Sequence, residues 1–282
     1  MQSEFIRLVK AELFMLRKRP GTWVILGLWA VETLVFGYIF PYVAYQNGSG
    51  EFYEGLDVML PVNMVAAVGE GMPFFGGALA LILGVLTVGG EFGWGTWKTV
   101  LTQGPSRTAV FAAKMTALML AMLPFVLVGY GLGAVASSTV AIVEDATMTW
   151  PGVRTMVEAV LSGWLVLAVW AATGALLATW TRGTSLAIGL GIIWGLALEG
   201  LISAFASSIS WLEWLVDLLL RSNGYSLVQA VAGGVENIGG NNGPGSFSGP
   251  YVSGTQATIV LLLYLAVFLG GSLILMRKRD VA

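Results

Sequence analysis

The chain has 282 residues, of which 56% are hydrophobic and 11% charged, with a formal net charge of −2 and a mean hydropathy of +0.80. Water-soluble domains carry about 25% charged residues, so this composition excludes an ordinary soluble protein and indicates one that lies in a lipid bilayer. Because the sequence contains neither cysteine nor histidine, it excludes disulfides, thiolate chemistry and nearly all zinc, haem and iron–sulfur centres.

Residues 3–18, which precede the first apolar run, predict an amphipathic helix. Apolar side chains recur at helical spacing on one face, and four lysine or arginine residues supply a cationic side. A helix of this kind lies along a membrane interface with its basic side chains near anionic headgroups. The alternative is an ordinary basic flank that only sets the topology. A Pro-Gly pair at residues 20–21 then turns the chain into the membrane.

Six apolar segments predict membrane-spanning helices, each of which needs about 20 residues. The second segment is short, although an extension back to Val65 is possible. No internal repeat is evident, so the inverted halves of many secondary transporters are not predicted. We therefore predict one all-α transmembrane domain over residues 1–282. The six segments are Trp23–Tyr45, Phe74–Gly89, Phe111–Val135, Val157–Trp180, Leu186–Ala206 and Ile259–Met276.

The distribution of basic residues predicts the orientation. With six spans, both termini and two loops share one side of the membrane. Basic residues accumulate on the cytoplasmic side, and almost all of them fall on the side of the termini, so both termini are predicted to be cytoplasmic. That side carries Arg7, Lys10, Arg17, Lys18, Arg19, Lys98, Arg107, Lys114, Arg182, Arg277, Lys278 and Arg279, and the opposite side carries Arg154 and Arg221.

The outer segment between the fifth and sixth spans, residues 207–254, has two parts. It begins "SSISWLEWLVDLLLR", which predicts a short amphipathic helix that lies in the outer interface or re-enters the bundle. The glycine-rich remainder has the composition of a flexible loop. A calcium loop is excluded there because Glu236 is the only carboxylate.

Two acids and two glycines inside the spans are candidates for a translocation path or a subunit seam. A charge at the bilayer centre costs about 2.5–3.5 kcal/mol on insertion scales, so Glu32 and Glu199 are expected to face protein or water. The alternatives are that Glu199 reaches the outer interface and that Glu32 sits protonated in a helix–helix hydrogen bond. Gly191 and Gly195 lie four residues apart, which allows another helix backbone to approach closely.

The loop at residues 91–107, between the second and third spans, is predicted to be cytoplasmic. Trp94, Trp97 and Leu101 lie three and four residues apart, so they share one face of a short helix, and Glu91 near its start suits the helix dipole. Exposed tryptophans are unfavourable unless a partner or lipid covers them. We interpret the loop as a docking site for another protein. The alternative is a connector whose tryptophans face lipid headgroups.

This loop resembles the signature loop of ABC-2 type permeases, the membrane subunits of many bacterial ABC exporters. Its pattern is Glu91…Gly95-Thr96-x-Lys98-x-x-Leu101…Pro105-x-Arg107…Lys114. The six spans, the basic amphipathic N-terminal helix, the large outer segment before the sixth span and the basic C-terminus agree with that family. The resemblance implies an ABC-2 (type V exporter-like) fold in a bacterial plasma membrane. It assigns docking of an ATPase subunit to Glu91, Trp94, Gly95, Thr96, Trp97, Lys98, Leu101 and Arg107.

The resemblance also implies which partners the chain has and which subunit binds ATP. Two permease subunits, identical or different, form a dimer in membrane lipid, and each receives a separate cytoplasmic ABC ATPase. The chain has no GxxxxGK[ST] phosphate-binding loop, so it is predicted not to be an enzyme, and ATP and Mg²⁺ are expected in the partner. No nucleic acid, metal or cofactor is expected. The resemblance places the first, second and fifth spans along the seam and path, and therefore Glu32 and Glu199 with them.

Two other functions are compatible with the same residues. An ion-coupled secondary transporter would use Glu32 and Glu199 as ion ligands and would work without nucleotide. A non-transporting membrane scaffold would use the loop to bind something other than an ATPase. A membrane-embedded enzyme has the least support, because no nucleophile–base pair or set of metal ligands is evident. The sequence does not predict the substrate.

Overall fold

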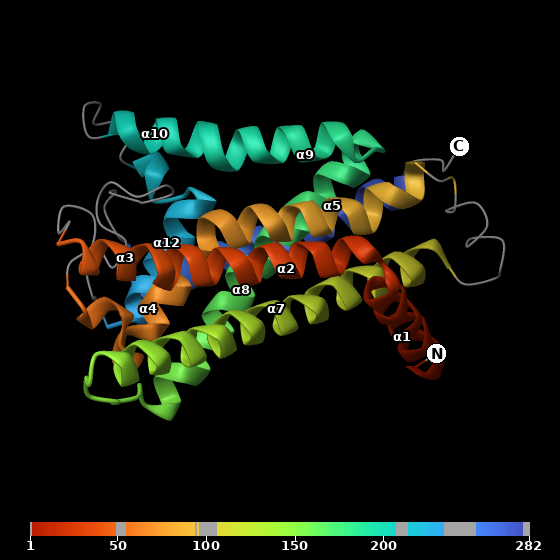
Figure 1. The fold of residues 1–282 in the computed structure, drawn as a ribbon. Helices are drawn as coiled ribbons and strands as arrows, with labels where there is room; N and C mark the ends of the chain where they lie inside the picture. The colour runs from red at the N-terminus through yellow and green to blue at the C-terminus, as the bar shows by residue number, and fades with distance from the viewer. Residues whose placement is uncertain are drawn as a thin grey trace.

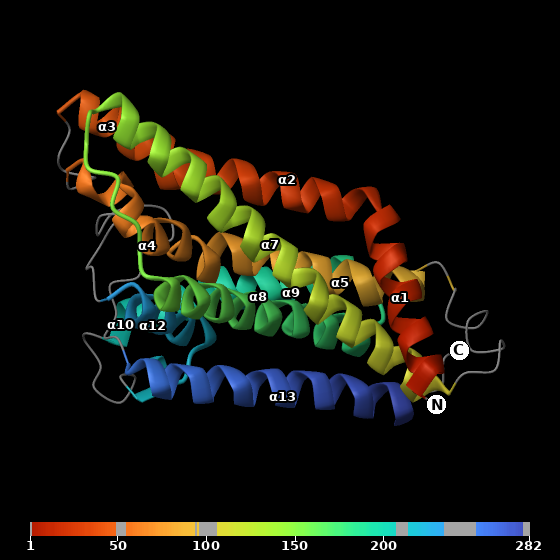
Figure 2. The same ribbon diagram turned by 90° about the horizontal axis from the view of Figure 1, so that it is seen from below.

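The computed structural model describes residues 2–48, 55–93, 95, 106–206, 214–233 and 252–278. Within these ranges every regular element is a helix, so the predicted all-α class is confirmed. Most of the helices run side by side in a bundle, and both chain termini lie at one end of it (Figures 1 and 2).

The helical elements follow one another with few long connections in the described ranges. In the first half they are α1 (Gln2–Lys18), α2 (Pro20–Leu34), η1 (Val35–Ile39), α3 (Phe40–Gln46), η2 (Asp57–Met59), η3 (Pro61–Asn63), α4 (Met64–Gly69), η4 (Met72–Gly76) and α5 (Gly77–Gly93). In the second half they are α7 (Arg107–Val143), α8 (Val153–Thr181), α9 (Ser185–Ile192), η5 (Ile193–Leu198), α10 (Glu199–Ala206), α12 (Leu220–Val231) and α13 (Gly254–Lys278).

Six continuous helical stretches are long and apolar enough to cross a membrane, which confirms the six predicted spans. The second begins earlier than its apolar core suggested, because the short turn η3 and the helix α4 precede η4 and α5 in the same stretch. The polar Glu70 and the glycine after it interrupt its hydropathy there. The stretches are Pro20–Gln46, Pro61–Gly93, Arg107–Val143, Val153–Thr181, Ser185–Ser203 and Gly254–Arg277.

The closest helix contact lies between α5 and α8, at the centre of the bundle. A Cβ atom built on Gly84 would lie 2.1 Å from the carbonyl oxygen of Ala171, and one built on Gly174 would lie 2.1 Å from the carbonyl oxygen of Leu81. Only glycine allows two helix backbones to touch in this way. The contact makes α8 the most deeply buried of the six spans, and it joins α5 and α8 into the core on which the other helices pack.

The predicted N-terminal helix is present as α1, which leaves the axis of α2 near Pro20 (Figure 1). Its apolar side chains lie in two different environments. Leu16 is buried against the bundle, where α1 packs on α7, whereas Ile6 and Phe14 are more than half exposed. The helix is therefore fastened to protein along one face and leaves apolar groups on another. Its placement at a membrane interface stays a prediction.

A short polar helix, α12, is buried at the end of the bundle away from both termini (Figure 1). It begins at Leu220, later than the predicted amphipathic segment, of which residues 207–213 lie outside the described residues. Every side chain from Leu220 to Gln229 is buried, with α13 and α8 as the main neighbours. Because α12 overlaps the predicted amphipathic segment only at Leu220 and Arg221, the placement of that segment stays a prediction.

Candidate functional site

Four charged side chains meet at the end of the bundle where the termini lie. The ammonium group of Lys114 lies 2.6 Å from Glu12 Oε2 and 2.5 Å from Glu91 Oε1. Arg19 adds a second positive charge, 3.7 Å from Glu91 Oε1, and also donates a hydrogen bond of 3.0 Å to the Leu86 carbonyl oxygen. We call Glu12, Arg19, Glu91 and Lys114 the basal charge cluster. It joins three helices, α1, α5 and α7, with the residue that precedes α2.

The basal charge cluster is shielded from solvent. The side chain of Lys114 is 1% exposed and that of Glu91 is 6% exposed. Burial raises the pKa of Glu12, and the charge of Lys114 opposes this shift. A buried charge is tolerated only when charges of opposite sign and hydrogen bonds compensate it. In this cluster two acidic side chains contact two basic ones, so the ion pairs hold α1, α5 and α7 against one another.

The cluster lies at the base of the predicted docking loop. Glu91 precedes the end of α5 by two residues, and Lys114 lies two turns inside α7. The α7 helix begins with a side-chain cap, in which Ser106 Oγ accepts a hydrogen bond of 3.2 Å from the Ala109 backbone N–H. The cluster thus fastens the two helices that carry the loop to each other and to α1.

The loop itself is described only at its two edges. Gly95 is exposed and has a φ of +65°, a left-handed conformation that favours glycine, and its N–H bonds back to the Phe92 carbonyl oxygen. Arg107 is exposed at the first position of α7. The remaining predicted docking residues lie outside the described residues, so their role stays a prediction. They are Trp94, Thr96, Trp97, Lys98 and Leu101.

Glu91, one of the predicted docking residues, is buried at the base of the loop. Its carboxylate contacts Lys114 and is 6% exposed. Glu91 therefore holds the base of the loop, and its assignment to docking of a partner stays a prediction.

The two acids inside the spans contact different elements. Glu32 lies beside the interruption of the second span: a Cβ atom built on Gly71 would lie 2.8 Å from Glu32 Oε1. Glu199 is 1% exposed, and its Oε2 accepts a hydrogen bond of 2.7 Å from the Arg221 backbone N–H. Glu199 is therefore buried within the chain and held by α12, and its place beside a path, a seam or the outer interface stays a prediction. No group of three or more acidic residues that could hold a metal ion occurs in the described ranges.

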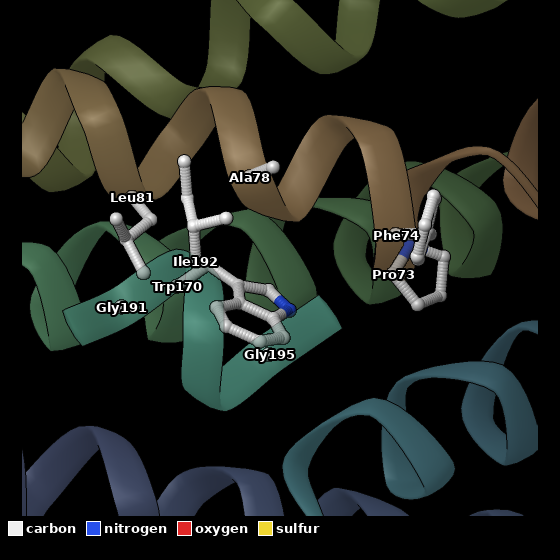
Figure 3. Close-up of a pocket in the computed structure, with 8 residues that line it drawn as sticks. All are labelled: Pro73, Phe74, Ala78, Leu81, Trp170, Gly191, Ile192 and Gly195. Atoms are coloured by element: carbon white, nitrogen blue, oxygen red, sulfur yellow. The ribbon is translucent and has the colours of Figure 1, made fainter. Parts of the chain in front are cut away.

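Gly191 and Gly195 form a contact within the chain. Cβ atoms built on them would lie 2.5 Å from Leu81 Cδ1 and 2.4 Å from Trp170 Cη2, respectively. The fifth span therefore uses these glycines to approach α5 and α8 of its own bundle, and their assignment to a path or a seam between subunits stays a prediction. Both glycines also line a pocket (Figure 3).

Three spans contain a π-helical segment, and each segment lies within three residues of an acid. Such segments are rare and recur at functional sites. Hydrophobic periodicity does not signal them, because the side chains on either side remain apolar, and they were not predicted. The pairs are Val35–Ile39 with Glu32, Met72–Gly76 with Glu70, and Ile193–Leu198 with Glu199.

Comparison with known proteins identifies the family. The family model described as "ABC-2 family transporter protein" matches residues 6–281, nearly the whole chain. The chain belongs to the ABC-2 transporter family. No curated protein matches it. As an ABC-2 protein it is a multi-pass membrane component of an ABC transporter, and family membership implies that it works with an ABC ATPase. The predicted membership of this family is thereby confirmed.

Proposed function

We propose that this ABC-2 protein is the permease subunit of an exporter, driven by separate ATPase subunits that dock at the loop between the second and third spans. The observation that carries the proposal is the basal charge cluster. A loop that transmits force needs a rigid base, and Lys114 contacts both Glu12 and Glu91 at that base. Exposed Arg107 and the two tryptophans of the loop supply the contacts with the partner.

The path of the force follows from the packing. Movement of the docked ATPase displaces the loop, and the basal charge cluster makes α1, α5 and α7 move together. The backbone contact between Gly84 and Ala171 passes the displacement from α5 to α8 at the centre of the bundle. ATP and Mg²⁺ are bound by the partner, where phosphoryl transfer takes place, and this chain supplies the movement across the membrane.

A second permease subunit, identical or different, completes the transporter. The first and fifth spans expose apolar side chains along their length, among them Val31, Ile39, Ile193 and Leu201. These faces are proposed to form the seam with the second subunit and with membrane lipid. Both termini and the docking loop are proposed to face the cytoplasm, as the distribution of basic residues predicts.

Capture of the ATPase tests the proposal. The chain is coexpressed with ABC ATPase subunits of its source genome, beginning with any encoded next to it, and is then purified through a tag. We expect the ATPase to co-purify, and the chain alone to hydrolyse no ATP. The double variant Trp97→Ala/Arg107→Glu should lose most of the captured ATPase and keep the wild-type melting temperature.

The control for capture is Arg154→Glu, a charge reversal at the opposite end of the bundle. Arg154 is exposed and pairs with the neighbouring Glu158 at 2.8 Å, so this change should affect capture little. Undiminished capture by the double variant would refute docking at this loop. Transport that is driven by an ion gradient without any ATPase would favour a secondary transporter instead.

The orientation has its own test, for which the absence of native cysteine is an advantage. Gly152 lies in the connection between α7 and α8, with nothing near its Cβ position, and Arg7 is exposed on α1. A membrane-impermeant maleimide should label Gly152→Cys on intact cells, and should label Arg7→Cys only after permeabilisation. The reverse pattern would invert the topology and place the docking loop outside the cell.

A further inference from the structure

Glu32 differs from the other acids of the six spanning stretches, because no residue in the described ranges compensates its charge. Its Oε2 is buried and has no hydrogen-bond partner, and the carboxylate forms no ion pair there. A carboxylate in lipid is costly unless a positive charge or hydrogen bonds compensate it, so Glu32 would be stabilised by a cation from outside the chain. The other acids and their partners are Glu70 with Gln229, Glu91 with Lys114, Glu158 with Arg154, and Glu199 with the Arg221 backbone N–H.

The carboxylate of Glu32 lies against the backbone of the second span at Gly71. A Cβ atom built on Gly71 would lie 2.8 Å from Glu32 Oε1 and 3.3 Å from Oε2. Both oxygens therefore occupy the space that a larger side chain at this position would fill. Glu32 and Gly71 are each partly exposed, so a ligand can reach the carboxylate from the surface of the bundle.

Four phenylalanine rings form a continuous cluster next to this carboxylate. Phe36 follows Glu32 by four residues and therefore lies on the same face of the first span. Its ring stacks on that of Phe75, with 5.0 Å between the ring centres. Phe40 meets the edge of Phe36 at 5.3 Å, and Phe74 meets Phe75 at 4.8 Å. We call these four residues the phenylalanine cluster; each is at least partly exposed.

The chemistry of this surface favours an organic cation over a metal ion. Aromatic rings attract cations through their faces, and the Arg221 guanidinium already lies 5.5 Å from the centre of the Phe74 ring. Calcium and magnesium need about six or more oxygen ligands, and no group of three or more acidic side chains suited to a metal occurs in the described ranges. A cation that carries apolar substituents matches both the carboxylate and the rings.

We propose that Glu32 and the phenylalanine cluster bind a lipophilic organic cation, a quaternary ammonium or phosphonium ion with apolar substituents, which enters from the membrane. Its charge lies near the Glu32 carboxylate, and its substituents pack on Phe36 and Phe75. An anion of the same shape would be repelled by the carboxylate, so charge complementarity decides which ligand is bound. That this cation is the exported cargo rests on the proposed function; the binding itself does not.

Equilibrium binding to the detergent-purified full chain tests the site. The probe is tetraphenylphosphonium, and the comparison ion is tetraphenylborate, which has nearly the same size and shape and the opposite charge. Equilibrium dialysis measures both ions, and empty detergent micelles give the amount that dissolves in detergent. We expect saturable binding of tetraphenylphosphonium, at least about tenfold tighter than that of tetraphenylborate. Equal binding of the two ions would overturn the inference.

A neutral replacement of Glu32 tests the role of its charge. Glu32→Gln keeps the shape of the side chain, so it should weaken binding of tetraphenylphosphonium about tenfold and should not weaken that of tetraphenylborate. The control is Glu158→Gln: the Glu158 side chain is 44% exposed and pairs with Arg154, so binding should stay unchanged. The melting temperature checks the folding of each variant. Wild-type binding by a folded Glu32→Gln variant would show that the carboxyl group of Glu32 is neutral, and would contradict the proposal.

A matched pair of phenylalanine variants tests the role of the rings. Phe36→Leu keeps an apolar side chain and removes the ring, so it should weaken binding of tetraphenylphosphonium about fivefold. Phe205→Leu makes the same change at an exposed position of α10, outside the phenylalanine cluster, and should leave binding unchanged. An equal effect of the two substitutions would show that the phenylalanine cluster is no part of the site.

None of these measurements needs an ATPase, so the inference and the proposed function can fail separately. A chain that captures its ATPase but binds no tetraphenylphosphonium would overturn the inference and leave the proposed function standing. If, in addition, Glu32→Gln changes the oligomeric state of the purified chain, the partner of the carboxylate is a basic residue of a second subunit. A chain that binds the cation but captures no ATPase would contradict only the proposed function.

Discussion

Replacing Lys114 with methionine should lower the free energy of unfolding by about 3–5 kcal/mol, because it removes the cation that two buried carboxylates contact. Glu12 and Glu91 would then lie close together in a desolvated site with their shared partner gone. Denaturant or thermal unfolding of the detergent-solubilised protein, followed by circular dichroism, measures the loss. ATPase capture should fall with it, since the base of the docking loop is no longer held.

A triple variant shows whether the effect comes from the uncompensated charge. Glu12→Gln, Glu91→Gln and Lys114→Met together leave no buried acid and no buried ammonium at this place. Neutral replacement of a whole buried ionic group is often nearly without cost, so the triple variant should regain most of the lost stability. If Lys114→Met alone melts like the wild type, the basal charge cluster does not hold the three helices together.

Gly84→Ala should also destabilise the protein, by about 1–3 kcal/mol, although the same change usually stabilises a helix. In a helix interior alanine is favoured over glycine by about 1 kcal/mol. At Gly84 the new methyl group would meet the Ala171 carbonyl oxygen at 2.1 Å, a backbone atom that cannot turn aside, so α5 and α8 must separate. Unfolding measurements in detergent quantify the loss.

Gly90→Ala is the matched control on the same helix. Nothing lies within 4 Å of the Cβ position of Gly90, so here the helix propensity should act alone and the change should be neutral or slightly stabilising. The outcome that contradicts the packing at the centre of the bundle is a Gly84→Ala variant as stable as Gly90→Ala. Gly174→Ala probes the same contact from α8, and we expect it to behave like Gly84→Ala.

Lys114 is a residue of the candidate site whose role the sequence did not predict. In the sequence it is one more base on the cytoplasmic side, at the start of an apolar run, and the pattern of the loop includes it only as a flanking charge. Its structural role depends on its ion pair with Glu12, which lies 102 residues away in the chain. No local pattern relates these two positions, so neither the pairing nor the burial of Glu91 could be predicted.

The second span shows a related limit in the fold. Its apolar core was recognised, but its beginning at Pro61 was not, because Glu70 and Gly71 lower the hydropathy of the segment that α4 and η4 occupy. In the structure this interruption is compensated by distant groups: Gln229 of α12 donates a hydrogen bond of 3.0 Å to Glu70 Oε1. A polar break inside a span is tolerated where other parts of the chain satisfy it.

By itself the sequence determined the six spans, the helical class and the family, because each is a property of contiguous residues. A run of apolar side chains has no stable alternative to a helix in lipid, where every backbone hydrogen bond must be made within the segment. Only the tertiary structure decided which charges are buried together, which glycines touch a neighbouring backbone, and that α12 lies inside the bundle. Those features depend on distances between segments far apart in the chain, and the energies of charge pairing and close packing are determined by distances of this kind.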